Sequence, residues 1–285
     1  MEIEVKGHSG CKIEIVNDGT KLIICKSTQA PSYMSRLQRQ AEKQRDMSKT
    51  IYQHIRIPEI YSIDRSESTL SINMEYVYSK NFVDYFEDAG FNQIDYFVKA
   101  LKIFIDSEVD KNEMKDIGKS RLLDKFEDVC RKIANNNCIN TDDEVDCILK
   151  MSAGVFQALD NNMLLPVGVC HGDLTFSNIL FNGNNYYLID FLDSFVETPL
   201  MDLVKIRQDS CYAWSQLMYS HDLDNVRMSI ISNKIDREID SYYSRYTWYN
   251  SYYKAFQLMN FLRILQYAKE KKVIEYLKST IKSML

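Results

Sequence analysis

The chain has 285 residues, of which 45% are apolar and 26% charged, and its net charge is −5 at pH 7. This length allows one large domain or two lobes with a core each, and the composition is that of a soluble globular protein. The negative charge argues against a nucleic-acid-binding surface and weakly favours neutral or cationic small substrates.

Hydropathy and cysteine usage exclude further classes. No apolar run approaches the length of a membrane span, and the N-terminal sequence MEIEVKGHSG lacks the apolar core of a signal peptide. The seven cysteines are an odd number without paired metal-ligand spacing, which indicates reduced thiols. We therefore expect a cytoplasmic protein with neither a membrane nor a nucleic acid as partner.

The first 77 residues predict a small lobe built on an antiparallel sheet. Apolar alternation between turn residues predicts five strands, at residues 3–5, 13–15, 22–25, 57–63 and 69–77. Pro31 and Ser32 begin a helix that runs to about Tyr52, with apolar residues at helical spacing.

After residue 77 the pattern becomes helical. Helices are expected at residues 82–87, 94–106, 119–134, from a capping box at Thr141 to about Leu159, and through much of 234–285. Apart from one central hairpin, no further strand is expected. Residues 1–77 and 78–285 thus form the two predicted lobes.

The residues with catalytic chemistry are concentrated in one stretch, residues 170–194, which reads CHGDLTFSNILFNGNNYYLIDFLDS. Asp173 and Asn178 lie five residues apart in a polar loop. Two short apolar strands follow, joined by an Asn-Gly-Asn-Asn insert, and Asn and Gly tolerate the positive φ of a tight turn. Because this hairpin folds back, Asp190 at its far end returns to the neighbourhood of Asn178.

Two carboxylates and an amide brought together in this way suit metal-assisted phosphoryl transfer. The reaction needs a base-like carboxylate to orient the attacking hydroxyl and oxygen ligands to hold Mg²⁺ on the phosphates. We assign Asp173 to the first role, and Asn178 and Asp190 to the second. Ordinary turn residues are the competing interpretation, and the coincidence of spacing and hairpin favours the catalytic one.

This stretch resembles the HGDxxxxN loop and the following I-D-F strand of the aminoglycoside phosphotransferase and choline kinase family, which are relatives of protein kinases. The resemblance implies an α+β, bilobal, protein-kinase-like fold with a small antiparallel-sheet lobe and a larger, mainly helical lobe. It implies ATP or GTP with Mg²⁺ as cofactors and a small-molecule hydroxyl as acceptor.

The resemblance also implies phosphate-binding residues in the first lobe. Lys26, at the end of the third strand, stands where the family places the lysine that grips the α- and β-phosphates. Glu42, on the following helix, stands where the family places the glutamate that pairs with that lysine. Gly7 and Gly10 lie in the turn that corresponds to the phosphate-covering loop. A solvated edge lysine, a surface glutamate and an ordinary hairpin turn are the alternatives.

Two further elements carry the resemblance. Glu75 and Val77 lie in the linker between the lobes, which in the family hydrogen-bonds adenine through backbone groups. Asp202 belongs to a P-x-x-D-L element that opens a helix after the metal-binding strand. A buried Asp202 would accept backbone N–H bonds from the catalytic loop and hold it rigid.

No motif as specific as that of the catalytic stretch marks the residues that would bind the acceptor. Asp193 follows the metal-binding strand and can contact the metal, attract a cationic acceptor or remain solvated. Trp248 and Tyr249 belong to an aromatic stripe near the C-terminus. Core packing is the simpler account of that stripe, and an acceptor pocket with a cation or sugar against aromatic faces is the functional one.

The sequence thus predicts an ATP- or GTP-dependent kinase that phosphorylates a hydroxyl of a small molecule, such as an amino alcohol, a sugar or an aminoglycoside. Leu192 follows Asp190-Phe191 where protein kinases have Gly, and no A-P-E element follows, so a protein kinase is disfavoured. A non-catalytic nucleotide-binding pseudokinase is the alternative, although every expected catalytic residue type is present.

Overall fold

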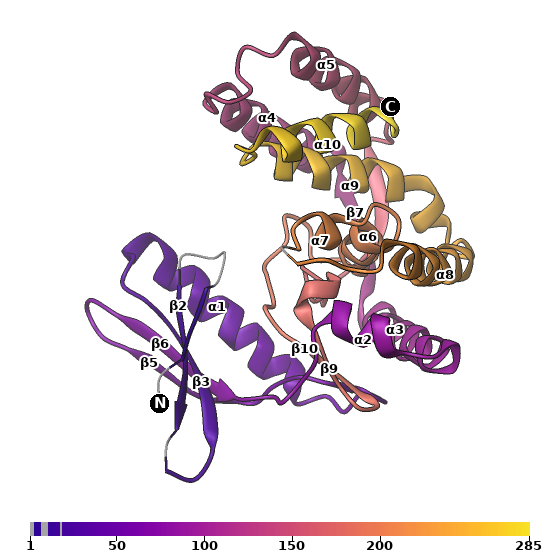
Figure 1. Cartoon of the computed structure of the whole chain (residues 1–285). Helices are drawn as coiled ribbons and strands as arrows, with labels where there is room; N and C mark the ends of the chain where they lie inside the picture. The colour runs from indigo at the N-terminus through magenta and orange to yellow at the C-terminus, as the bar shows by residue number, and fades with distance from the viewer. Residues whose placement is uncertain (1–2, 7–10, 18, 220) are drawn as a thin grey trace.

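The computed structural model describes residues 3–6, 11–17, 19–219 and 221–285. A small lobe built on a β-sheet and a larger, mainly helical lobe lie side by side (Figure 1). The predicted α+β class is confirmed. Among the described residues, no helix combines the length and the apolar character that a membrane crossing requires.

The small lobe contains a five-stranded antiparallel sheet in the order β1-β2-β3-β6-β5. Its strands are β1 (Ile3–Lys6), β2 (Lys12–Asn17), β3 (Leu22–Thr28), β5 (Ile60–Arg65) and β6 (Leu70–Glu75). Helix α1 (Pro31–Ser48) packs Met34, Leu37 and Ala41 against Leu70 and Ile72 of the sheet in a separate small core. All five predicted strands of this lobe are confirmed.

The large lobe has one continuous core and is built mainly from helices. They are α2 (Phe82–Asp88), α3 (Phe91–Lys111), α4 (Lys119–Ala134), α5 (Asp143–Gln157), α6 (Pro199–Ser210), α7 (Trp214–Leu217), α8 (Asn225–Tyr243), α9 (Thr247–Leu265) and α10 (Lys271–Lys282). Thr198 caps α6, and Pro199 begins it, as a missing N–H allows in the first turn. Every residue of α6 except the half-buried Lys205 is buried, so this helix passes through the middle of the lobe.

The expectation of no further strand after residue 77, apart from the central hairpin, is wrong, and one short strand before that residue was not predicted either. Strand β7 (Glu113–Gly118) pairs antiparallel with β8 (Asn162–Val167), and β4 (Ile55–Arg56) pairs parallel with β10. Strand β7 is short, mostly polar and exposed, so its residues show none of the apolar alternation that marks a half-buried strand. Its position depends on a partner that follows it by more than forty residues.

The predicted hairpin is confirmed, with a tighter turn than its Asn-Gly-Asn-Asn insert suggested. Strands β9 (Ile179–Asn182) and β10 (Asn185–Leu188) pair with Asn182 opposite Asn185, which leaves two residues in the turn. Gly183 has φ +57°, a conformation that favours glycine at the first central position of such a turn. The second strand ends at Leu188, and Asp190 lies beyond it.

Candidate active site

The first residues of the catalytic loop are held by one buried carboxylate of α6. Asp202 on α6 accepts backbone hydrogen bonds from His171 N at 2.5 Å and from Gly172 N at 2.7 Å. Its residue surface is wholly buried, and burial raises the pKa of Asp202 to about 6, so it remains ionised at neutral pH. This is the loop-holding role that the sequence predicted for Asp202.

Gly172 adopts a conformation that only glycine accommodates at this point of the loop. Its φ is +89°, and a Cβ atom there would lie 2.0 Å from the backbone oxygen of Leu192. Leu192 N also donates to His171 O at 3.0 Å. The catalytic loop and the segment after β10 are therefore in direct backbone contact.

A second buried carboxyl, Glu108 of α3, lies against Asp202. Burial and the neighbouring Asp202 carboxylate raise the pKa of Glu108 well above its ordinary value. Glu108 and Asp202 are close enough to share a hydrogen bond, which two carboxyl groups can form only when one of them carries a proton. We infer that Glu108 is neutral and that Asp202 holds the negative charge.

His171 is a structural residue of this loop. Its Nδ1 accepts from Asp173 N at 3.2 Å, so Nε2 carries the proton and donates to Ile189 O at 3.0 Å. Burial lowers the pKa of His171 to about 4, which keeps the ring neutral. The imidazole thus ties the catalytic loop to the residue just before Asp190.

Asp173 and Asn178 meet as predicted. The Asn178 side-chain nitrogen donates to Asp173 Oδ2 at 2.9 Å and to Asp173 O at 2.8 Å. On its other oxygen, Asp173 pairs with Lys205 of α6 at 3.0 Å. Burial would raise the pKa of Asp173, but the Lys205 ammonium and these hydrogen bonds outweigh it and lower that pKa.

Asp190 is brought to the same place by the hairpin. Ile189 N donates to Asn178 O at 3.0 Å, and Asp190 has φ +61°, which turns the chain sharply after β10. From the small lobe, Lys26 Nζ reaches Asp190 Oδ1 at 2.7 Å. Burial lowers the pKa of Lys26, but the Asp190 carboxylate more than compensates and raises it.

The expected pairing of Glu42 with Lys26 is not what the structure shows. Glu42 is exposed, and its Oε1 accepts from Gln38 on the outer side of α1. Because α1 places its buried residues against the sheet, its polar side chains that line the cavity beside Lys26 are the uncharged Gln40 and Gln44. A charge partner for Lys26 therefore comes from Asp190 and not from α1.

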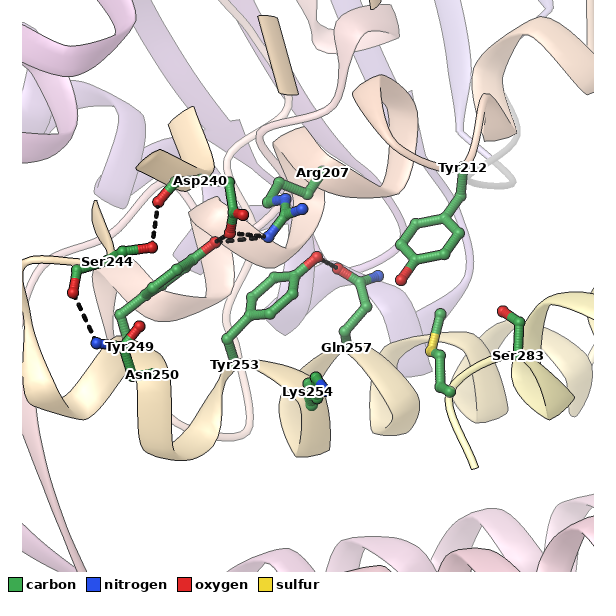
Figure 2. Close-up of a pocket in the computed structure, with 11 residues that line it drawn as sticks. Arg207, Tyr212, Asp240, Ser244, Tyr249, Asn250, Tyr253, Lys254, Gln257 and Ser283 are labelled. Atoms are coloured by element: carbon green, nitrogen blue, oxygen red, sulfur yellow. Dashed lines mark hydrogen bonds and ion pairs between the residues drawn. The ribbon is translucent and has the colours of Figure 1, made fainter. Parts of the chain in front are cut away.

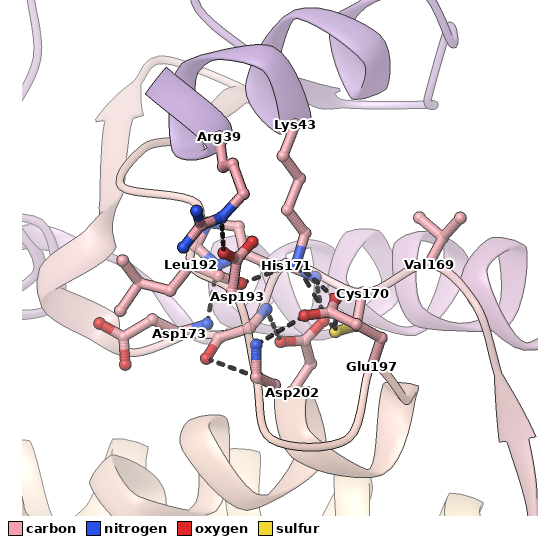
Figure 3. Close-up of polar contacts among 12 residues, drawn as sticks. Arg39, Lys43, Val169, Cys170, His171, Asp173, Leu192, Asp193, Glu197 and Asp202 are labelled. Atoms are coloured by element: carbon pink, nitrogen blue, oxygen red, sulfur yellow. Dashed lines mark hydrogen bonds and ion pairs between the residues drawn. The ribbon is translucent and has the colours of Figure 1, made fainter. Parts of the chain in front are cut away.

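Two other cations of α1 cross to the large lobe (Figure 3). Lys43 Nζ contacts Glu197 Oε2 at 2.6 Å and Leu192 O at 2.7 Å. Arg39 Nε contacts Asp193 Oδ2 at 2.8 Å. The sequence left Asp193 three roles, a metal contact, attraction of a cationic acceptor or a solvated charge, and the structure places it in this ion pair between the lobes.

The linker residues lie between the sheet and the hairpin. Glu75 ends β6, where its N donates to Glu59 O at 2.9 Å, while Val77 O accepts from Ser79 Oγ at 3.4 Å. Their role in binding adenine stays a prediction. Gly7 and Gly10 lie outside the described residues.

The two aromatic candidates lie in the helical packing. Trp248 is buried and stacks on Tyr246, and the Tyr249 hydroxyl donates to Asp240 Oδ1 and accepts from Arg207. Among the described residues, neither has a contact with Asp173, so the structure gives the acceptor assignment no support. Core packing describes Trp248, whereas Tyr249 also lines a separate cavity of the large lobe, and the acceptor role of both residues stays a prediction.

Comparison with protein families identifies the chain. The phosphotransferase enzyme family, APH, matches residues 28–223, which is more than half of the sequence. The chain belongs to this family. This confirms the predicted relationship to aminoglycoside phosphotransferases and the prediction of a small-molecule kinase. A comparison of the phosphotransferase with curated proteins finds no match.

Solved structures show the same fold at low identity. The GDP and kanamycin complex of APH(2")-IIia is 13% identical, covers 100% of this chain and 92% of its own, and has a TM-score of 0.62. Spectinomycin phosphotransferase APH(9)-Ia, in complex with ADP and spectinomycin, is 11% identical. The match covers 99% of this chain and 91% of that one, with a TM-score of 0.56. Glucosamine kinase, in complex with glucosamine, ADP and inorganic phosphate, is 11% identical. The match covers 100% of this chain and 76% of that one, and its TM-score is also 0.56. The kinase-like bilobal fold is thereby confirmed.

Sequence reasoning missed Lys205 and Lys43 in this phosphotransferase. Lys205 lies three residues after Asp202, so one helical turn brings both to the loop, and this spacing was a usable signal. Lys43 gives no such signal, because its partners Leu192 and Glu197 lie about 150 residues later in the chain.

We expect Glu108→Gln to stabilise the phosphotransferase at neutral and alkaline pH. The raised pKa of Glu108 means that the folded state binds a proton that the unfolded state has released above its ordinary pKa, so folding becomes less favourable as pH rises. A neutral amide removes this dependence. The melting temperature should rise by a few degrees, about 2–4 °C for each kcal/mol, and more at pH 8 than at pH 5.

Glu127→Gln, at an exposed glutamate of α4, is the matched control and should leave this pH dependence unchanged. A Glu108→Gln protein that loses stability equally at both pH values would show that Glu108 is ionised in the fold.

Proposed function

We propose that this phosphotransferase moves the γ-phosphate of ATP or GTP to a hydroxyl of a small molecule such as an amino alcohol, a sugar or an aminoglycoside. The observation that carries the proposal is the convergence of Asp173, Asn178 and Asp190 with Lys26, which arrives from the other lobe. A loop and a hairpin of one lobe thus meet the sheet of the other where the phosphates would lie.

Nucleotide use is supported by three structural relatives, whose structures contain ADP or GDP. In this chain Lys26 is the buried cation at that position, and its pKa is raised, so it is charged at neutral pH. We assign it to the phosphates. Glu75 and Val77 remain the proposed adenine-side linker, on the family resemblance alone.

Mg²⁺ fits the residues present. Asn178 uses its nitrogen for two hydrogen bonds to Asp173, which turns Oδ1 away as a free oxygen, and no described residue donates to it. Asp190 is half-exposed and offers Oδ2 beside the oxygen that pairs with Lys26. An amide oxygen and a carboxylate are hard ligands of the kind Mg²⁺ prefers. When bound there, Mg²⁺ would neutralise charge on the phosphates.

We assign Asp173 the role of base. Its pKa is lowered, so it is ionised at neutral pH and can accept a hydrogen bond from the acceptor hydroxyl. Asn178 fixes the orientation of this carboxylate, and Lys205 holds its other oxygen. Asp173 then takes the hydroxyl proton as the new P–O bond forms.

A nucleotide-consumption assay against a panel of amino alcohols, sugars and aminoglycosides tests the function directly. Phosphorylated product should appear with at least one compound and should disappear with Asp173→Asn. Nucleotide binding without turnover on a broad panel would favour the pseudokinase alternative.

Substitution of each aspartate by asparagine should separate their roles. Asp173→Asn keeps the size of the side chain but cannot take the proton, so turnover should fall about 10²–10⁴-fold while Mg·ATP affinity survives. Asp190→Asn removes a charged ligand of the metal, so Mg²⁺-dependent nucleotide binding should weaken together with turnover. Calorimetric titration of Mg·ATP distinguishes them, and the reverse pattern of binding would refute both assignments.

Lys26→Ala should weaken nucleotide binding or turnover, because the proposed phosphate contact is lost. The fold should survive, since Lys26 is not part of the apolar core of the small lobe and its partner Asp190 is half-exposed. Glu42→Ala is the matched control on α1. Since Glu42 faces solvent, it should leave nucleotide affinity unchanged. Equal losses in both variants, measured by the same titration, would restore the pairing that the sequence first suggested.

Removal of Lys205 should change the pH dependence of catalysis. Without its ammonium, burial raises the pKa of Asp173, so more of the base is protonated in acid. The acidic limb of the kcat/KM profile of Lys205→Met should therefore move to higher pH. Lys99→Met, at an exposed lysine of α3, is the control. A loss that is uniform across pH would indicate a purely structural lysine.

A further inference from the structure

A second polar cavity, of about 370 Å³, lies in the large lobe between α6, α8, α9 and the residues that follow α10 (Figure 2). The side chains that line it are Arg207, Tyr212, Asp240, Ser244, Tyr249, Asn250, Tyr253, Lys254, Gln257, Ser283 and Met284. None of them belongs to the catalytic loop or to the hairpin.

This cavity and the active site use opposite faces of α6. Lys205 and Asp209 contact Asp173 and Phe176 N of the catalytic loop. With about 3.6 residues per turn, Arg207 points to the far side of the helix, where it meets α8 and α9. A ligand in the cavity is therefore separated from the reacting groups by the thickness of α6.

Two carboxylates surround Arg207 at the cavity wall, Asp240, which lines the cavity, and Asp236, which lies behind it. The guanidinium forms a two-pronged ion pair with Asp236, at 2.8 and 3.0 Å, and a third contact with Asp240 Oδ1. Tyr249 also donates to Asp240 Oδ1, at 2.8 Å. No described residue donates to Asp240 Oδ2, and Asp240 is half-exposed, so this oxygen is available to a ligand cation.

Gln257 supplies an unused donor in the same wall. It is 1% exposed, and its oxygen accepts from the Tyr253 hydroxyl at 3.0 Å. Its Nε2 has no hydrogen-bond partner among the described residues. A buried amide N–H₂ without a partner costs about 1–3 kcal/mol, so an oxygen acceptor in the cavity would relieve it. Lys254, three residues earlier on α9, offers a second donor to oxygen.

Aromatic rings form much of the remaining surface. Tyr249 and Tyr253 lie with their ring centres 5.0 Å apart, and Arg207 lies over the Tyr253 ring at 4.5 Å. Tyr212 faces them from the end of α6 (Figure 2). Tyrosine faces bind the C–H surface of a saturated ring and also attract cations.

We propose that this cavity binds a small polyhydroxylated ring that carries an amine, an amino sugar being the simplest case. The amine contacts Asp240 Oδ2, ring oxygens or hydroxyls accept from Gln257 Nε2 and Lys254, and the ring lies against the tyrosines. The site is distinct from the acceptor site beside Asp173, and it stands whether or not the proposed reaction is correct.

The methionine methyl groups allow the two sites to be observed separately. Met284 lines this cavity, and Met74 of β6 lines the cavity beside Lys26. In protein labelled with ¹³C at the methionine methyls, with signals assigned by single Met→Leu substitutions, glucosamine should shift the Met284 signal saturably. Mg·ADP should shift Met74, which confirms that the reporters are independent.

Two probes and two variants test the ligand chemistry. Glucose lacks the amine and putrescine lacks the oxygens, so each should bind at least about tenfold more weakly than glucosamine at the Met284 reporter. Asp240→Asn keeps an acceptor for Arg207 but removes the charge, and Gln257→Leu removes the unused donor. Each should weaken glucosamine binding by a similar factor, while Mg·ADP still shifts Met74.

A Met284 signal that stays unmoved by glucosamine would overturn the proposal, as would a glucosamine affinity unchanged in Asp240→Asn. If glucose bound as tightly as glucosamine, the amine would not be recognised. If putrescine bound as tightly, the ring oxygens would not be recognised, and Gln257 would have no role in binding. If Gln257→Leu does not fold, Asp240→Asn decides the matter alone, because Arg207 keeps its pair with Asp236.

Discussion

The active site depends on one buried carboxylate. Asp202 takes the N–H groups of His171 and Gly172, and this fixes the backbone from which Asp173 projects. The same loop touches Leu192 so closely that only glycine fits at position 172. A shift of Asp202 would therefore displace Asp173 and the segment after β10 together, and the neutral Glu108 beneath it keeps a second charge out of that space.

Three ion pairs connect the two lobes at the segment that follows β10. Lys26, Arg39 and Lys43 come from the small lobe and meet Asp190, Asp193 and Glu197, which lie within eight residues of one another. Only Lys26 and Lys43 are largely buried among these cations, so their pairs are less screened than that of the exposed Arg39. The small lobe thus contacts the large lobe through the segment that follows β10.

Local sequence signals predicted the catalytic centre and failed where position depends on distant packing. The Asn-rich turn and the five-residue spacing were sufficient to bring Asp173, Asn178 and Asp190 together, because hairpin geometry is local. Glu42 was misplaced because charge alone does not reveal which side of α1 faces the sheet, and buried Gln40 and Gln44 occupy that side. The aromatic stripe correctly indicated a buried helix face, but it carried no information on whether Asp173 or Arg207 lay opposite. Strand β7 was missed because its mostly polar, exposed residues show no apolar alternation and its partner β8 follows more than forty residues later.

The ion pair between Lys26 and Asp190 has a consequence for how ligands enter. Each partner is the other's counter-ion, and each is also the group that a different part of a metal–nucleotide complex would take. A nucleotide that binds Lys26 without a metal would leave the Asp190 carboxylate facing the phosphate oxygens. A metal ion that binds Asp190 without a nucleotide would leave the Lys26 ammonium beside the metal. A preformed complex exchanges both partners at once and exposes neither charge. If Lys26 takes the phosphates and Asp190 the metal, as proposed, the cleft would favour the complex over either component alone.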